Sequence, residues 1–242
     1  MKLLAPITLF ALLSSCPGGG GAPDRVAAAS VVRGPQIAQV EAGSAVVAWR
    51  TEAPVVGEIV CSSGLHSIDA EPSREHVFSI PGLAADTLYE YSIVNDGAPS
   101  GGAYSFRTAP VIGTGTVRFV VVGDSGSKDE VQAAVAASIT RSLPDLVLIP
   151  GDVVYETGAE SEIERAYFLP YRSLLGRVPF YLALGNHDVM SDNGSPLLDS
   201  VYMPTNDAEG SERFYSFDRG PVHFVALDST QEIAVGSVQG DW

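Results

Sequence analysis

The chain is poor in cysteine, with two among 242 residues, Cys16 and Cys61. So few cysteines exclude the disulfide framework that replaces a hydrophobic core in small secreted scaffolds. Apolar residues make up 45% of the chain, which is enough to build a sizeable core instead. Because Cys16 has another predicted role, described below, we expect Cys61 to be a small buried hydrophobe outside any disulfide or metal site.

Positive charge is also scarce, since 14 Lys and Arg face 29 Asp and Glu and the formal net charge is -15. This balance argues against binding of duplex nucleic acid, which depends on Lys and Arg contacts to phosphate. It also argues against electrostatic attraction to anionic lipid. One explanation of the acidity is that it only keeps an exported protein soluble. If the substrate is an anion, the acidic surface repels it, so a local positive field, such as that of bound metal cations, is needed to bind it.

No apolar run is long enough to cross a bilayer permanently, because the N-terminal run covers only residues 3–13. This run follows Lys2 and has the form of a secretory signal. It leads into Leu13-Ser14-Ser15-Cys16, which resembles the bacterial lipobox, and the resemblance implies lipidation of Cys16. We therefore expect a lipoprotein signal peptide at 1–16 and a Gly/Pro-rich tether at 17–30. The protein would be an exported, bacterial membrane-anchored lipoprotein facing the periplasm or cell surface, or, with an ordinary cleaved signal, secreted.

Residues 31–110 show the pattern of short strands separated by turns. Side chains alternate with a period of two in 45–51, 89–93 and 104–108, and turn sequences such as Asn95-Asp96-Gly97 lie between such segments. This spacing predicts an all-β sandwich in which Trp49 is a core residue and His66 and His76 are surface or turn residues. The segment 83–91 resembles the tyrosine-corner strand of fibronectin type III domains.

The periodicity changes after residue 116 and predicts an α/β domain at 111–242. We expect strands at 117–122, 146–149 and 180–184, helices at 130–142 and 160–175, a polar loop at 189–212, and two further strands at 214–217 and 222–227. Val131, Val135 and Ile139 have the spacing of one helical face. Strands that alternate with helices indicate a parallel sheet.

Three motifs that begin with glycine follow the three predicted parallel strands: Gly123-Asp124-Ser125-Gly126, Gly151-Asp152-Val153-Val154-Tyr155 and Gly185-Asn186-His187-Asp188. Ligands of open α/β sheets bind beyond the carboxyl ends of the strands, so these side chains should meet at one edge. Oxygen ligands with an added imidazole suit hard or borderline metals. Asp152 has two oxygens and would bridge two cations, and the Tyr155 phenol would need a strong Lewis acid such as ferric iron. Taken singly, Asp124 and Asp152 also fit the role of strand-end turn residues.

The three motifs in this order resemble those of the purple acid phosphatases, a branch of the calcineurin-like metallophosphoesterases. Many relatives in the wider superfamily have histidine where this chain has Gly126, and that glycine together with Tyr155 points to the purple branch. A fibronectin-like domain before the catalytic domain is also usual in that branch. The resemblance covers about 31–242 and implies the fold of an αββα metallophosphoesterase domain.

The resemblance also implies residue roles. Asp124 and Tyr155 match ligands of an Fe(III) site, and Asp152 matches the carboxylate that bridges to a second, divalent metal (Zn, Mn or Fe). Asn186 matches a ligand of the second metal, His187 a proton donor near the leaving oxygen, and Asp188 a residue that orients His187. The implied reaction is hydrolysis of phosphomonoesters by a metal-bound hydroxide.

The family's later histidines, one alone and then a Gly-His-x-His pair, are absent from this chain. The resemblance therefore implies that 111–242 is the N-terminal part of the catalytic domain, C-terminally truncated at Trp242, and that the chain alone is inactive or weak. Two alternatives stay open: a non-catalytic surface lipoprotein that binds a partner, and a phosphodiesterase on the same scaffold. We expect His223 to be a core or sheet-face residue, and Asp228 is a lesser candidate ligand at a strand end.

Overall fold

The computed structural model describes residues 29–206 and 210–242. The predicted signal peptide, the proposed lipidation site Cys16 and the tether up to residue 28 lie outside the described residues. Within the described ranges, no helix combines the length and apolar character needed to cross a membrane.

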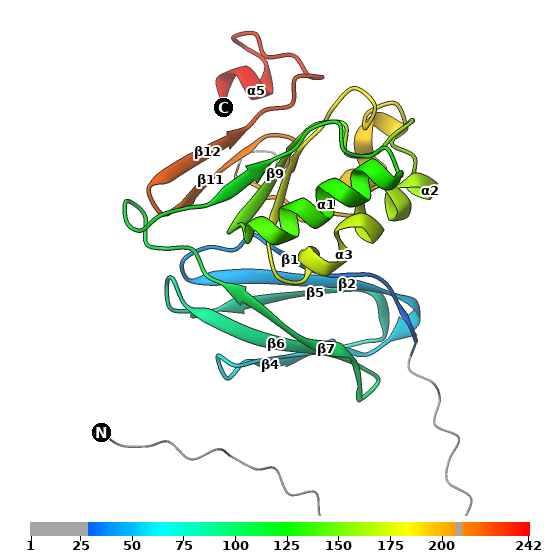
Figure 1. Ribbon diagram of the computed structural model, residues 1–242, viewed down its shortest axis with the longest axis vertical. Helices are drawn as coiled ribbons and strands as arrows, with labels where there is room; N and C mark the ends of the chain where they lie inside the picture. Colours follow the sequence, from blue (N-terminus) through cyan, green and yellow to red (C-terminus); the bar gives the residue numbers. More distant parts are fainter. Residues whose placement is uncertain (1–28, 207–209) are drawn as a thin grey trace, which may run out of the picture.

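The N-terminal part of the described chain is a β-sandwich, as the sequence predicts (Figure 1). One sheet has the order β1-β2-β5 and the other β4-β3-β6-β7, with antiparallel neighbours throughout. Inward-facing side chains from both sheets, including Trp49, Ile59 and Tyr91, form its core, and Cys61 is buried and free. The strands are β1 (Val31–Ala38), β2 (Ser44–Val55), β3 (Gly57–Cys61), β4 (His66–Ile68), β5 (Ser73–Pro81), β6 (Leu88–Asn95) and β7 (Ala98–Arg107).

Tyr89 of the sandwich has the contact expected from its sequence, and His76 does not. The Tyr89 hydroxyl accepts a hydrogen bond from the Ala84 backbone N–H at 2.9 Å, which is the bond that defines a tyrosine corner. His76, in contrast, is fully buried, so its prediction as a surface or turn residue is wrong. Its ring lies against Trp49 and its Nδ1 lies 2.5 Å from the Asp69 carboxylate, because a buried imidazole needs polar partners.

The C-terminal part has a parallel sheet of order β10-β9-β8, built from β8 (Phe119–Val121), β9 (Leu146–Pro150) and β10 (Phe180–Ala183). Leu146, Val147 and Ile149 of the central strand β9 are buried, which explains its continuous apolar sequence. A separate antiparallel pair, β11 (Tyr215–Arg219) and β12 (Val222–Ala226), follows the sheet, and α5 (Val238–Asp241) ends the described chain. Figure 1 shows this pair beside the parallel sheet and α5 at the end of the α/β part away from the sandwich, while Arg219 at the end of β11 donates to the Val40 and Arg107 carbonyls.

The first connecting helix, α1 (Glu130–Ser142), has the predicted bounds. Its N-cap Asp129 accepts a hydrogen bond from the Gln132 N–H, and the chain leaves the helix through left-handed Leu143. Of the predicted face, Ile139 is buried and Val135 packs against the core, and Gln132 and Ala136 are buried beside them. Val131 is 69% exposed instead, whereas the Gln132 amide reaches inward and donates to the Ala166 carbonyl at 2.6 Å.

The second connection differs from the single predicted helix. It consists of α2 (Glu160–Ile163), a π-helical turn η1 (Glu164–Phe168) and α3 (Leu169–Leu175). Pro170 has no N–H to donate to the carbonyl four residues earlier, which is that of Ala166, and the Gln132 amide bonds this carbonyl instead. The predicted loop 189–212 likewise contains short helical turns at Asp192–Gly194 and at α4 (Ser195–Leu198).

The two parts meet where β1 packs beside η1 and α3 (Figure 1). Arg33 of β1 pairs with Glu160 at 2.6 Å, and the Tyr91 hydroxyl donates to the Gly176 carbonyl at 2.8 Å. These contacts fix the sandwich against the helices that follow β9.

Candidate metal centre

The three predicted motifs lie at one edge of the parallel sheet, in the loops that follow β8, β9 and β10. An open cavity of ≈ 470 Å³ is lined by Asp124, Asp152 and Asn186, together with Ser229 and Thr230. The prediction that the strand ends bring these side chains together is therefore confirmed for Asp124, Asp152 and Asn186.

Asp124 and Asp152 share an unusual backbone conformation. Their φ angles are 54° and 52°, in the left-handed region that short polar residues adopt at sharp turns. The Asp124 N–H donates to the Gly151 carbonyl at 3.3 Å, which joins the ends of the two strands. The backbone of the third motif also passes close to Asp152, which requires glycine at position 185, because a Cβ atom there would lie 2.2 Å from Oδ1 of Asp152.

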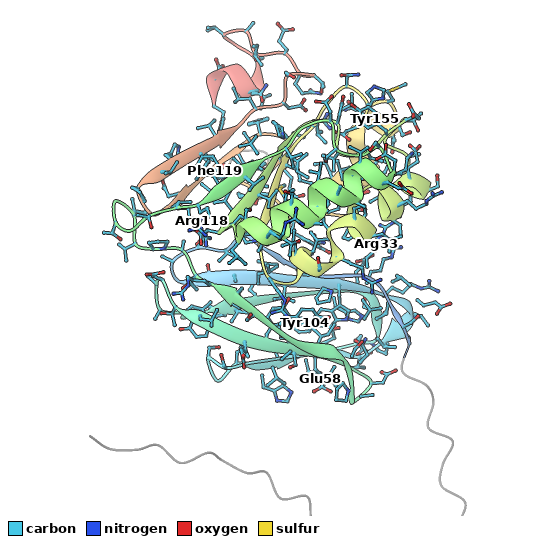
Figure 2. The ribbon with its side chains drawn as sticks, in the orientation of Figure 1. Arg33, Glu58, Tyr104, Arg118, Phe119 and Tyr155 are labelled. Atoms are coloured by element: carbon cyan, nitrogen blue, oxygen red, sulfur yellow. The ribbon has the colours of Figure 1, made fainter. Side chains whose placement is uncertain are left out.

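Tyr155 connects the two carboxylates. Its phenol lies 2.9 Å from Oδ1 of Asp124 and 3.0 Å from Oδ2 of Asp152, and Figure 2 shows it at the end of the α/β part away from the sandwich. Burial raises the pKa of the Tyr155 phenol, and the hydrogen bonds to Asp124 and Asp152 raise it further. Three oxygens from two loops thus converge, with one phenol proton between two carboxylates.

His187 is held from both sides. Its backbone N–H donates to Oδ1 of Asp152 at 3.0 Å, and its Nδ1 lies 2.6 Å from the Glu156 carbonyl. A carbonyl can only accept, so Nδ1 carries the proton and Nε2 is left for chemistry. The hydrogen bond to Glu156 raises the pKa of the His187 imidazole, and the negative charge of Asp152 raises it further. Loss of water around the ring lowers this pKa but does not cancel the rise.

Asp188 has a different environment from the one expected of a residue that orients the His187 ring. Its carboxylate is fully buried and accepts the N–H groups of Val154 at 2.8 Å, Gly185 at 2.8 Å and Val153 at 3.2 Å. Burial raises the pKa of the Asp188 carboxyl, and these three hydrogen bonds oppose the rise. The His187 ring is held by the Glu156 carbonyl and not by Asp188. Asp188 instead joins the second and third motifs by accepting their backbone N–H groups.

The donor set fits a hard or borderline cation. None of the ion pairs in the described part of the chain involves Asp124 or Asp152, and the groups that donate to these carboxylates, a phenol and a backbone N–H, carry no charge. A cation among these oxygens would remove the repulsion of two neighbouring carboxylates. Across residues 29–206 and 210–242 no cluster of three or more His, Cys, Asp or Glu is placed to hold a metal, because half of this set is a phenol and an amide.

Residues 117–233 match the family described as calcineurin-like phosphoesterase. This segment is a calcineurin-like phosphoesterase domain. Its relatives include purple acid phosphatase 22 of Arabidopsis thaliana, 29% identical over 177 residues, and purple acid phosphatase 15 of the same plant, 28% identical over 200 residues. The matches cover 69% of this chain in each case, but only 38% and 37% of the relatives. The chain therefore spans less than two fifths of the length of these phosphatases.

The fold of the chain is also found in a solved structure, titled "Structure of PhoD". That structure superimposes with a TM-score of 0.57 at 13% sequence identity, over 86% of this chain and 53% of that chain. At this identity the similarity concerns the fold alone.

Gly126 explains how the first motif of this phosphoesterase domain is built. A Cβ atom at Gly126 would lie 2.3 Å from the Val153 carbonyl oxygen and 2.9 Å from the Tyr155 N. These are backbone atoms and cannot move aside cheaply. The absence of a side chain at this position thus lets the Tyr155 loop close over the first motif.

Two side chains that build the loops of the phosphoesterase domain carry no signal in the sequence. Glu162 and Lys128 bond the backbone that follows Tyr155, and no Ser, Thr, Asp or Asn precedes Glu162 by three residues to signal a capping box. Asp228 is fully buried and bonds Arg213 Nε at 2.8 Å, so it is a structural residue beside the cavity and its candidacy as a ligand is wrong. His223, expected in the core or on a sheet face, is 57% exposed and bonds Asp218.

Proposed function

We propose that this protein is a metal-dependent phosphoesterase of the acid phosphatase type, which hydrolyses phosphomonoesters at a dinuclear centre. The observation that carries the proposal is the convergence of the Asp124, Asp152 and Tyr155 oxygens in the cavity that Asn186 also lines. The similarity of two thirds of the chain to purple acid phosphatases supports it.

In this proposal the two metals have different ligands. Asp124 and Tyr155 would hold Fe(III), because a phenol binds well only to a strong Lewis acid. Asp152 would bridge, since its two oxygens already face different partners, the Tyr155 phenol and the His187 N–H. Asn186 would hold the divalent ion, zinc, manganese or ferrous iron, through its neutral amide oxygen.

When bound, the two cations would supply Lewis acidity toward the phosphoryl group. His187 would hold a proton at Nε2 and transfer it to the leaving oxygen, because Nδ1 is committed to the Glu156 carbonyl. Asp188 would keep the Gly185 and Val154 backbones in place and is a positioning residue.

Metal loading and substrate profiling test this function. The protein loaded with Fe(III) and Zn²⁺ or Mn²⁺ should show visible absorption from an iron phenolate and should hydrolyse p-nitrophenyl phosphate faster than its bis(p-nitrophenyl) diester. Faster diester cleavage would indicate the phosphodiesterase alternative. Failure of the 242-residue chain to bind either metal would contradict the proposed centre and support the partner-binding alternative, whereas slow release of phosphate by this chain agrees with the absence of the later histidines. Robust turnover by the 242-residue chain would contradict the sequence-based prediction that it is inactive or weak alone.

We further propose that the sandwich is a fibronectin type III-like domain and that Cys16 anchors the exported protein to a membrane. The tyrosine corner at Tyr89 and the pairing of a three-stranded with a four-stranded sheet support the first part. The lipobox-like sequence before Cys16 supports the second. Cells that express the protein should incorporate labelled fatty acid into it, and Cys16→Ser should abolish the label. Equal labelling of both forms would contradict lipidation at Cys16.

A further inference from the structure

The segment 155–159 has no regular secondary structure, yet its backbone is held by one carboxylate. Oε1 of Glu162 accepts the Glu156 N–H at 2.8 Å. Oε2 accepts the Thr157 N–H at 3.0 Å, the Thr157 hydroxyl at 3.0 Å and the Ala159 N–H at 3.3 Å. The loop is therefore wrapped around the Glu162 side chain.

Lys128, in the loop between the first motif and α1, binds the same carboxylate and the Tyr155 carbonyl. Its ammonium donates to the Tyr155 carbonyl and lies 3.1 Å from Oε1 of Glu162. Both side chains of this pair are about one fifth exposed, at 21% and 20%. Lys128 is itself fixed, because its backbone N–H donates to the Gln132 side chain at 2.9 Å and Gln132 is buried.

The other side of the segment delivers two contacts to the candidate metal centre. Tyr155 places its phenol on Asp124 and Asp152, and the Glu156 carbonyl places the His187 ring. We propose that Glu162 and Lys128 act as one unit of positioning residues, which holds segment 155–159 so that the Tyr155 phenol and the His187 ring are in place before a metal or substrate binds. The relevance of this unit to catalysis rests on the function proposed above.

The bonding pattern requires a charged carboxylate. Four donors and an ammonium surround two oxygens, so an amide at position 162 would turn one acceptor into an NH₂ group that faces donors. Burial alone would raise the pKa of the Glu162 carboxyl, but the hydrogen bonds from Thr157, Glu156 and Lys128 lower it to about 2. The carboxylate thus stays ionised through the acidic range in which an acid phosphatase works.

Amide hydrogen exchange of the metal-free chain is the direct test. In Glu162→Gln, the amides of Glu156, Thr157 and Ala159 should exchange roughly tenfold faster or more, because charge-assisted hydrogen bonds protect them in the wild type. Glu160→Gln is the matched control, since it makes the same chemical change on α2 but bonds Arg33 and not the loop. Wild-type exchange of these amides in Glu162→Gln would overturn the proposal.

A second measurement tests whether the pair acts as a unit on the centre. Calorimetric titration with Mn²⁺ should show weaker binding, by roughly tenfold, in Glu162→Gln and in Lys128→Met, with no further loss in the double variant. If the losses of Mn²⁺ affinity in the two single variants add up in the double variant, the proposal is overturned. It is also overturned if Glu162→Gln binds Mn²⁺ like the wild type although its loop amides exchange faster. If the wild type binds no Mn²⁺, the proposed function fails, and the exchange experiment still decides whether Glu162 positions the loop.

Discussion

The Tyr155 phenol and Oδ1 of Asp124 lie 2.9 Å apart although 31 residues separate them in the chain. The contact joins the loop after β8 to the loop after β9, and Asp152 completes it at 3.0 Å from the same phenol. One proton serves two carboxylates here, so removing the phenol, a carboxylate or the fixed backbone around them should have distinct and separable effects.

Removal of the phenol oxygen should affect the metal centre more than the fold. In Tyr155→Phe the ring can keep its contact with His187, at a centroid distance of 4.5 Å, while both hydrogen bonds are lost. We expect a change in unfolding free energy of about 1 kcal/mol and complete loss of visible absorption after Fe(III) loading. An unchanged visible spectrum would contradict the assignment of Tyr155 as an iron ligand.

Asp152 should be the most sensitive position for metal loading. Asp152→Asn keeps the shape of the side chain and its acceptor for the His187 N–H, but it removes the charge that would bridge two cations. We expect Mn²⁺ affinity in calorimetry to fall by roughly a hundredfold or more, as for loss of a charged ligand. Asp86→Asn, on an exposed turn of the sandwich, is the control and should bind like the wild type. A loss of less than about threefold in Asp152→Asn would argue against a bridging role, since outer-shell partners alone typically contribute tenfold or more.

The sequence predicts this architecture well where a strong physical pattern is local. The apolar run of β9 and the period-two alternation of β2 allow the parallel sheet and the sandwich to be predicted, because burial on two faces or on one dictates each pattern. The edge position of Asp124, Asp152 and Asn186 follows from the same strands. The carboxyl ends of parallel strands have to meet at one edge.

The features that the sequence does not predict depend on single long-range contacts. The buried Gln132 amide donates to the Ala166 carbonyl, which the missing N–H of Pro170 leaves without a helical partner, and this contact between distant residues is not visible in the periodicity of α1. His76 is buried because Asp69 and Thr51 satisfy its ring, and neither residue is its neighbour in sequence. Asp188 and Glu162 have loop-building roles that depend on which backbone N–H groups the fold leaves without a helical or sheet partner.

Gly126 should be intolerant of even a methyl group. In Gly126→Ala the new Cβ would meet the Val153 carbonyl at 2.3 Å, so the loop that carries Tyr155 has to move. We expect a loss of about 2 kcal/mol in unfolding free energy, measured by urea denaturation, together with weaker Mn²⁺ binding. Gly102→Ala is a matched control, because no atom lies within 4 Å of a Cβ at that position. Similar stability of the two variants would contradict the close approach seen at Gly126.

Asp188 should be required for folding stability more than for His187 chemistry. Asp188→Asn replaces one of the oxygens that accept Val153, Val154 and Gly185 N–H groups with a donor, which leaves a buried N–H unpaired. We expect a loss on the order of 2 kcal/mol in unfolding free energy, against almost none for the exposed Asp192→Asn. Wild-type stability of Asp188→Asn would show that the buried carboxylate is dispensable for joining the two motifs.

Glu212 should make the protein less stable at alkaline pH. Burial raises the pKa of its carboxyl to about 7, while the Met203 N–H, 3.2 Å from Oε1, opposes the rise and the charge of Asp199 adds to it. Between the ordinary glutamate pKa of 4.5 and about 7, the unfolded chain has released this proton and the folded chain has not, so stability falls as pH rises through this window. Glu212→Gln keeps an acceptor for Met203 and removes the charge. It should therefore raise the unfolding free energy by on the order of 2 kcal/mol at pH about 8 and change it little at pH about 5, in urea titrations at both values. Glu71→Gln, exposed in the sandwich, should show no such difference, and an equal effect of Glu212→Gln at both pH values would contradict a raised pKa as its cause.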